Sequence, residues 1–151
     1  MAGLVVITPA AGYVTVGGAL VLGLAAGAVC YWFVVFLKPR LGYDDSLDAF
    51  GVHGVAGVMG TLGVGLFAAP FITAPFGMNG GKGYAGLFYG NSAALTIQGE
   101  ATVTAILVAF LGTLAVFALV KATIGLRVTE KEEAIGLDIT QHNEKAYTLI
   151  E

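Results

Sequence analysis

One side chain is a candidate for chemistry because it is ionisable and lies inside a long apolar segment. His53 follows Asp45 and Asp48 by one to two helical turns, and no further ionisable side chain occurs until Lys82. An ionisable group inside a membrane is costly and marks a functional site by default. The alternative is an imidazole that only hydrogen-bonds a neighbouring helix for packing.

The surroundings of His53 predict a conduit rather than a reactive centre. At α-helical spacing its neighbours are mostly small residues with one aromatic ring, namely Ala49, Phe50, Ala56 and Gly57. No second His or Cys stands at ligand spacing in the apolar segments, so a metal site is disfavoured. His142 is far along the chain, in a charged stretch. Since no nucleophile–base pair, phosphate loop or catalytic carboxylate pair occurs, we expect neither enzymatic activity nor a cofactor.

Two carboxylates precede the segment that carries His53. Asp45 and Asp48 stand where a helix would begin. Carboxylate oxygens accept hydrogen bonds from free backbone N–H groups there, and they suit the positive end of the helix dipole. We therefore predict that both aspartates cap and support this helix.

Composition places these residues in a membrane protein. The chain has 151 residues, of which 57% are hydrophobic and 11% charged, whereas soluble domains carry about 25% charged residues. No charged side chain occurs in Met1–Leu37, Gly83–Gly99 or Ala101–Val120. About 18 apolar residues suffice to cross a bilayer core. The net charge of −3 and the lack of a basic patch argue against a nucleic-acid partner.

The apolar runs predict an all-α fold, a polytopic transmembrane helical bundle. Residues 1–128 form the membrane domain, with spans at about 12–37, 47–69 and 92–121, and residues 129–151 form a charged tail. We expect Lys38, Pro39 and Arg40 to end the first span. Small residues repeat along the first two spans and predict close helix packing; they are Ala19, Gly23 and Gly27, then Gly51, Gly54, Gly57, Gly60 and Gly63.

The placement of Lys and Arg predicts the orientation. These residues flank the loop between the first two spans and the tail, whereas the loop before the third span holds only Lys82. The positive-inside rule therefore puts the tail in the cytoplasm of a multi-pass protein of the cell membrane. Within the tail, Thr129 and Glu132 predict a capping box, and Gly136 would end the short helix that follows.

The stretch from Asp44 to Gly54, DDSLDAFGVHG, resembles the signature of the ammonium transporter (Amt/Mep/Rh) family. Further segments resemble that family in the same order, so the resemblance covers essentially the whole chain. They are Ile7–Gly12, Gly17–Ala19, Gly86–Asn91, Gly125–Val128 and the tail from Gly136–His142 through Ala146–Tyr147.

The resemblance implies an eleven-helix transporter fold that assembles as a homotrimer with one pore in each subunit. Against the family, this chain corresponds to the end of the eighth helix, the ninth to eleventh helices and the cytoplasmic tail. Met1 stands where the family is within a helix. We therefore interpret the chain as a C-terminal fragment that does not conduct alone.

The resemblance also implies roles for individual residues. In the family, ammonium loses its proton and ammonia passes a narrow apolar pore lined by two facing histidines. His53 matches the second histidine, with Phe50 and Ala49 on the same face; the family more often has valine at the latter position. Asp45 matches an aspartate that caps and orients this helix. The substrate expected is thus ammonium or ammonia.

A regulatory tail is a second implication of the resemblance. In bacterial relatives this region packs between subunits and receives PII-type regulatory proteins, and in plant relatives a threonine matching Thr140 is phosphorylated. A phosphate there would add charge next to Asp138, and His142 lies in the same segment. Asn143 stands where relatives often have glycine, at a position that would suit a left-handed backbone. The alternative is a solvated tail without regulation.

Two further functional hypotheses remain open at the level of sequence. The chain could be a genuine three-span regulatory or structural subunit that pairs with a separately encoded N-terminal part. It could also form a small homo-oligomeric channel by itself. Loss of transport on replacement of His53 would separate the pore hypothesis from the first of these.

Overall fold

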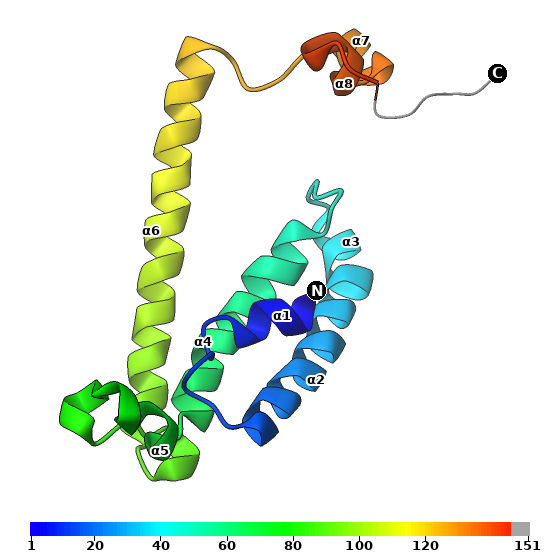
Figure 1. Cartoon of the computed structure of the whole chain (residues 1–151). Helices are drawn as coiled ribbons and strands as arrows, with labels where there is room; N and C mark the ends of the chain where they lie inside the picture. Colours follow the sequence, from blue (N-terminus) through cyan, green and yellow to red (C-terminus); the bar gives the residue numbers. More distant parts are fainter. Residues whose placement is uncertain (146–151) are drawn as a thin grey trace. The chain divides into compact units, whose positions relative to one another are not determined.

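The computed structural model describes residues 1–145; Ala146 and Tyr147 of the predicted tail lie outside the described residues. The chain divides into two compact units, Met1–Leu107 and Val108–Glu151. Every regular element of residues 1–145 is helical, apart from one isolated bridge between Val14 and Ala68 (Figure 1). The predicted all-α fold class is confirmed.

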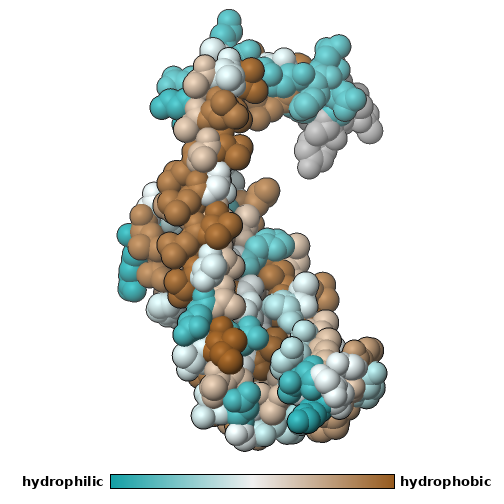
Figure 2. Space-filling model, turned by 90° about the vertical axis from the view of Figure 1, so that its left-hand side faces the viewer, coloured by the Kyte–Doolittle hydropathy of each residue, from teal (hydrophilic) through white to brown (hydrophobic). Residues whose placement is uncertain are grey.

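Three helices of the described residues are long and apolar enough to cross a membrane. They are Val16–Leu41, Phe50–Phe67 and Ala93–Thr123. The first consists of α2 (Val16–Trp32), a π-helical turn η1 (Phe33–Leu37) and α3 (Lys38–Leu41); the second of a π-helical turn η2 (Phe50–Gly54) and α4 (Val55–Phe67); the third is α6. Figure 2 shows the hydrophobic surface along α6 in brown. Such a surface suits lipid or neighbouring helices.

The first span runs through the Lys-Pro-Arg sequence, at which we expected it to stop, and ends at Leu41. It begins after Thr15, whose hydroxyl accepts a hydrogen bond from the backbone N–H of Gly18 at 3.2 Å. Gly42 follows, which has a left-handed backbone with φ +66°. Pro39 is tolerated because the wider turn of η1 lies just before it, and a normal α-turn would crowd the proline ring.

A short N-terminal helix, α1 (Ala2–Ile7), packs against both α2 and α4. Val6 and Ala10 are fully buried in this contact. Gly60 of α4 faces the backbone of α1, and a Cβ added there would lie 2.2 Å from the carbonyl oxygen of Val6. Only glycine fits at this crossing, because the obstructing atom belongs to the backbone.

The buried face of α2 differs by one position from the small-residue stripe seen in the sequence. Its buried residues are Gly18, Leu22, Ala26 and Cys30. Leu22 contacts Gly63, where an added Cβ would lie 2.7 Å from the leucine Cδ2 atom. Gly27 is exposed, with no atom within 4 Å of an added Cβ. Four-residue spacing describes several helix faces equally well, so the neighbouring helices decide which one is covered.

The segment between α4 and α6 is built from short helical turns that fold back onto the end of α4. They are α5 (Pro70–Thr73), η3 (Ala74–Phe76), η4 (Met78–Gly81) and η5 (Leu87–Tyr89). Thr73 is fully buried, and its hydroxyl accepts a hydrogen bond from the backbone N–H of Tyr84 at 2.6 Å. The N–H of Gly86 donates to the carbonyl of Ala68 at 2.8 Å. These bonds satisfy backbone groups that an apolar surrounding would leave unpaired.

The second unit contains two short helices after α6, α7 (Glu130–Ile135) and α8 (Leu137–His142). Thr129 and Glu132 form the predicted capping box: each side chain accepts a hydrogen bond from the backbone N–H of the other. Gly136 ends α7 with φ +112°, and Asn143 ends α8 with the left-handed φ of +52°.

Candidate functional site

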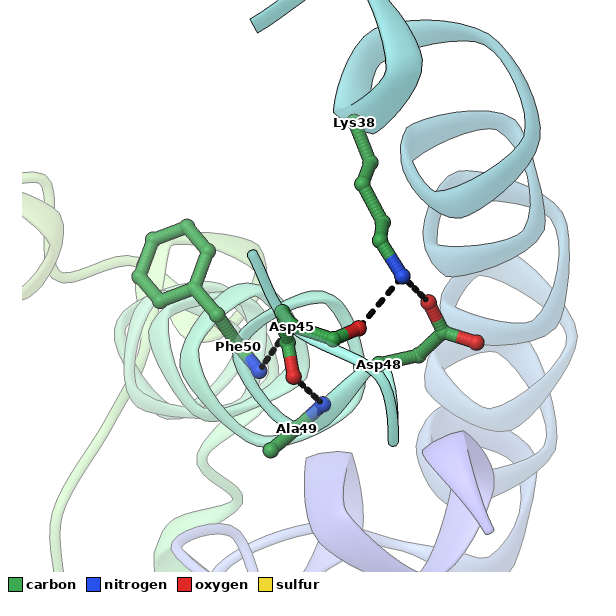
Figure 3. A network of polar contacts seen from close by, with 5 residues as sticks. All are labelled: Lys38, Asp45, Asp48, Ala49 and Phe50. Atoms are coloured by element: carbon green, nitrogen blue, oxygen red, sulfur yellow. Dashed lines mark hydrogen bonds and ion pairs between the residues drawn. The ribbon is translucent and has the colours of Figure 1, made fainter. Parts of the chain in front are cut away.

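The start of the second span is fixed by one carboxylate. The two oxygens of Asp45 accept hydrogen bonds from the backbone N–H groups of Ala49 and Phe50, each at 2.9 Å (Figure 3). The Phe50 N–H has the largest effect on the pKa of the Asp45 carboxyl and lowers it below its usual 3.8. Burial opposes this effect, and the Ala49 N–H and the charge of Lys38 add to the lowering. The carboxylate therefore stays charged where the positive end of the helix needs it.

Asp48, which we predicted together with Asp45 to cap and support this helix, is joined to the preceding span. Its carboxylate lies 2.5 Å from the ammonium of Lys38, at the end of the preceding span, and that ammonium also donates to the backbone carbonyl of Asp45 (Figure 3). Asp48 has a positive φ of +55°, so its backbone turns before the helix begins. The regular helix therefore starts at Ala49 rather than near Leu47.

Phe50 occupies the first residue of the π-helical turn and contacts two aromatic rings. Its ring centroid lies 5.7 Å from that of Phe33 and 6.1 Å from that of Tyr43, the latter in an edge-on arrangement. Gly54, one turn on, leaves room for the ring, because an added Cβ would lie 2.8 Å from Phe50 Cδ2. No pattern of residues indicated a π-helical turn here, and such turns often occur at functional sites.

Ala49, Phe50 and His53 are all exposed, whereas Ala56, expected on the same face, is fully buried. Within residues 1–145, the His53 imidazole makes no hydrogen bond or ion pair with the chain. The same residues hold no group of three or more His, Cys, Asp or Glu side chains able to bind a metal ion. The first turns of the span thus present an imidazole, an aromatic ring and a methyl group together.

The predicted regulatory residues lie in α8. The Thr140 hydroxyl donates to the carbonyl of Gly136 at 2.9 Å and is half-buried. Asp138 stands in the first turn of the helix and His142 in its last turn. The structure thus brings Thr140 and Asp138 onto one short helix, with the hydroxyl held against the junction between α7 and α8.

A cavity in the first unit was not anticipated from the sequence. It has a volume of about 320 Å³ and lies between the end of α4, the start of α6 and the loop that joins them. Its polar lining comes from Tyr13, Tyr84, Asn91 and Gln98. None of the predicted site residues lines it. The residues come from four segments, so no sequence spacing could have indicated the cavity.

Comparison with known proteins places the chain in one family. Residues 1–147 match the model of the Ammonium Transporter Family. The ammonium transporter of Bacillus subtilis is 44% identical over 147 residues, which is 97% of this chain and 35% of that protein. Ammonium transporter Amt1 of Archaeoglobus fulgidus is 46% identical over 149 residues, 98% of this chain and 35% of that protein.

A solved structure has a similar fold. The crystal structure of Saccharomyces cerevisiae Mep2 superposes with a TM-score of 0.76 at 33% identity, covering 87% of this chain and 30% of Mep2. The chain therefore spans about a third of the length of the relatives that it matches. The match to a family of transporters agrees with the expectation of a non-enzymatic membrane protein, and the chain belongs to the ammonium transporter family.

Proposed function

We propose that this chain forms one wall of a pore that conducts ammonium or ammonia across a membrane, with His53, Phe50 and Ala49 lining it. The observation that carries the proposal is the exposed imidazole on an apolar, membrane-long helix, without a partner in residues 1–145. Such a group is costly in hydrocarbon and needs a polar neighbour, which in a transporter is the permeant or a facing side chain.

The neighbours of His53 suit a small permeant. Neutral imidazole has one donor and one acceptor nitrogen, so it can exchange hydrogen bonds with ammonia. Phe50 and Ala49 add an apolar ring and a methyl group beside it, which exclude water. Because the chain spans about a third of its relatives, the opposite wall of the pore would come from residues outside it.

A chimera tests the proposal. The last third of the Bacillus subtilis ammonium transporter is replaced by this chain, and methylammonium uptake is measured in cells without their own ammonium transport. We expect uptake above background, and we expect His53→Ala to return it to background at an unchanged protein level in the membrane. Lys82→Ala, which removes an exposed ionisable side chain from a loop, is the control and should keep the rate.

Two outcomes contradict the pore assignment. A chimera that reaches the membrane and assembles but takes up no methylammonium would reject the function. Uptake that persists in His53→Ala would remove His53 from the pore and favour the alternative, a structural or regulatory subunit.

We further propose that the complete protein is a homotrimer whose tail is cytoplasmic and regulates transport, with a PII-type protein or a kinase as its partner. A phosphate on Thr140 would break the hydrogen bond to Gly136 and add charge on the helix that holds Asp138. In the chimera, Thr140→Asp should lower uptake and Thr140→Ser should not. Equal uptake in both variants would contradict regulation through this position.

A further inference from the structure

The ammonium of Lys38 joins the end of one span to the loop that starts the next. It pairs with the Asp48 carboxylate at 2.5 Å and donates to the backbone carbonyl of Asp45. Figure 3 shows it reaching from the end of the first span to both residues. The side chains of Lys38 and Asp48 keep 23% and 37% of their exposure, so the pair is partly screened from solvent.

The two residues that Lys38 contacts are the ones that set the beginning of the second span. Asp45 holds the N–H groups of Ala49 and Phe50, and the carbonyl of Asp48 accepts the N–H of Val52 at 2.9 Å. Asp48 also has a positive φ of +55°, which is uncommon for a non-glycine residue and is adopted more readily by Asp and Asn than by others. A contact that restrains this residue therefore restrains the first helical turn.

The two spans also touch beside this turn. Gly51 faces the π-helical turn η1, and a Cβ added there would lie 2.7 Å from Val34 Cγ2 and 3.3 Å from Phe33 Cδ1. The ring of Phe50 lies against Phe33 at 5.7 Å between centroids. The apolar contacts fix the distance between the spans, whereas the Lys38 contacts fix the loop that leads into the turn.

We infer that Lys38 is a positioning residue for the conducting turn: through Asp48 and the Asp45 carbonyl it holds Phe50 and His53 in place. The functional half of this inference rests on the proposed pore. Exposed ion pairs contribute little to overall stability. The role assigned here is geometric, because Lys38 contacts the loop at two points, Asp45 and Asp48, just before the helix begins.

The first test measures position and needs no transport. A fluorinated phenylalanine is placed at Phe50 of the chain in lipid nanodiscs, and its ¹⁹F resonance is compared among variants. Lys38→Met and Asp48→Asn should shift or split the resonance, because each removes the ion pair between the two residues. Asparagine is chosen at position 48 because it keeps the left-handed preference and loses only the charge. Lys38→Arg should restore the original signal. Arg40→Met, which removes an exposed cation from the same helix end, is the matched control and should not move it.

The second test measures selectivity in the chimera. The ratio of ammonium to methylammonium uptake does not depend on the amount of folded protein, so a merely destabilising change leaves it constant. Lys38→Met and Asp48→Asn should each change this ratio, on the order of tenfold if the conducting groups are displaced by about 1 Å. The double variant should change it no more than Lys38→Met alone, because Lys38→Met already removes the contact with Asp48.

The outcomes separate this inference from the proposed function. An unmoved ¹⁹F resonance in Lys38→Met and Asp48→Asn overturns the positioning role, whatever the chimera does. A moved resonance with a constant uptake ratio also overturns the role of Lys38 in conduction. If the unaltered chimera takes up neither ammonium nor methylammonium, the proposed pore function is rejected. The ¹⁹F result then still decides whether Lys38 positions the turn.

Discussion

Two helices of this protein begin in different ways. In the second unit, α7 begins with Thr129 and Glu132, which cap each other across three residues. In the first unit, the second span begins with Asp45, which caps the helix, and with Asp48, whose partner Lys38 belongs to the preceding span. The start of α7 is local, whereas the start of the second span depends on another helix.

The difference shows which interactions stabilise the start of each helix. A six-residue helix gains little from its own hydrogen bonds and depends on its cap. The second span has apolar length enough to be stable in a membrane, so its first turn can be held in a π-helical form by outside contacts. The region held by long-range contacts is also the one that presents His53.

The largest effect should come from crowding the contact between the spans. Gly51→Ala places a methyl group 2.7 Å from Val34 Cγ2, and β-branched valine cannot easily turn away. We expect a loss of about 1–3 kcal/mol in the free energy of unfolding, measured in mixed micelles titrated with a denaturing detergent.

The control for Gly51→Ala lies on the same helix. Gly57 has no atom within 4 Å of an added Cβ. Gly57→Ala should leave stability unchanged or raise it by up to about 1 kcal/mol through helix propensity. Equal results for the two variants would mean that the spans do not meet at Gly51.

The local start of α7 should be sensitive to its cap and to nothing distant. Thr129→Ala removes the hydroxyl that accepts from the N–H of Glu132, and we expect a loss of about 1 kcal/mol in helix stability. Faster amide hydrogen exchange in residues 130–135 of the purified chain would report it. Thr129→Ser keeps the hydroxyl and should exchange at nearly the original rate. An unchanged rate in the alanine variant would show that the capping box is dispensable.

Acid should weaken both helix starts. The hydroxyl of Thr129, and then its backbone N–H, lower the pKa of the Glu132 carboxyl below its usual 4.5. In the same way, the N–H groups of Phe50 and Ala49 lower the pKa of the Asp45 carboxyl below its usual 3.8. A lowered pKa gives stability that is complete above the usual value and is lost as the pH falls through the lowered one. Carboxyl ¹³C shifts recorded against pH should show both groups titrating below those values. Titration of Asp45 at or above 3.8 would contradict its capping contacts.

The smallest effect should come from the ion pair of the second unit. Arg127 lies 3.4 Å from Glu133, and both side chains are largely exposed, at 77% and 51%. Arg127→Gln should therefore change α7 stability by less than about 0.5 kcal/mol. If the amide hydrogen-exchange rate of α7 rises as much in Arg127→Gln as in Thr129→Ala, this helix also depends on the ion pair.

Local chemistry let the sequence predict a good part of this structure. The family, the all-α class, the capping box and the helix end at Gly136 follow from residue types at short spacing. The π-helical turns and the ion pair of Lys38 could not be predicted, because they depend on which side chains two spans bring together. For the same reason Asp45 and Asp48, equivalent in the sequence, have different roles.

The sequence by itself determined that the chain forms apolar helices of membrane length. It also determined that the second of these helices carries one imidazole near its beginning. Length, hydropathy and caps are properties of neighbouring residues, so they are set before the chain folds. Only the tertiary structure decided that Lys38 meets Asp48, that Gly51 and Gly60 lie at helix crossings, and that Ala49, Phe50 and His53 are exposed together. These contacts depend on the relative rotation and register of the packed helices. Close contacts between residues far apart in the sequence fix that rotation and register, whereas sequence spacing does not.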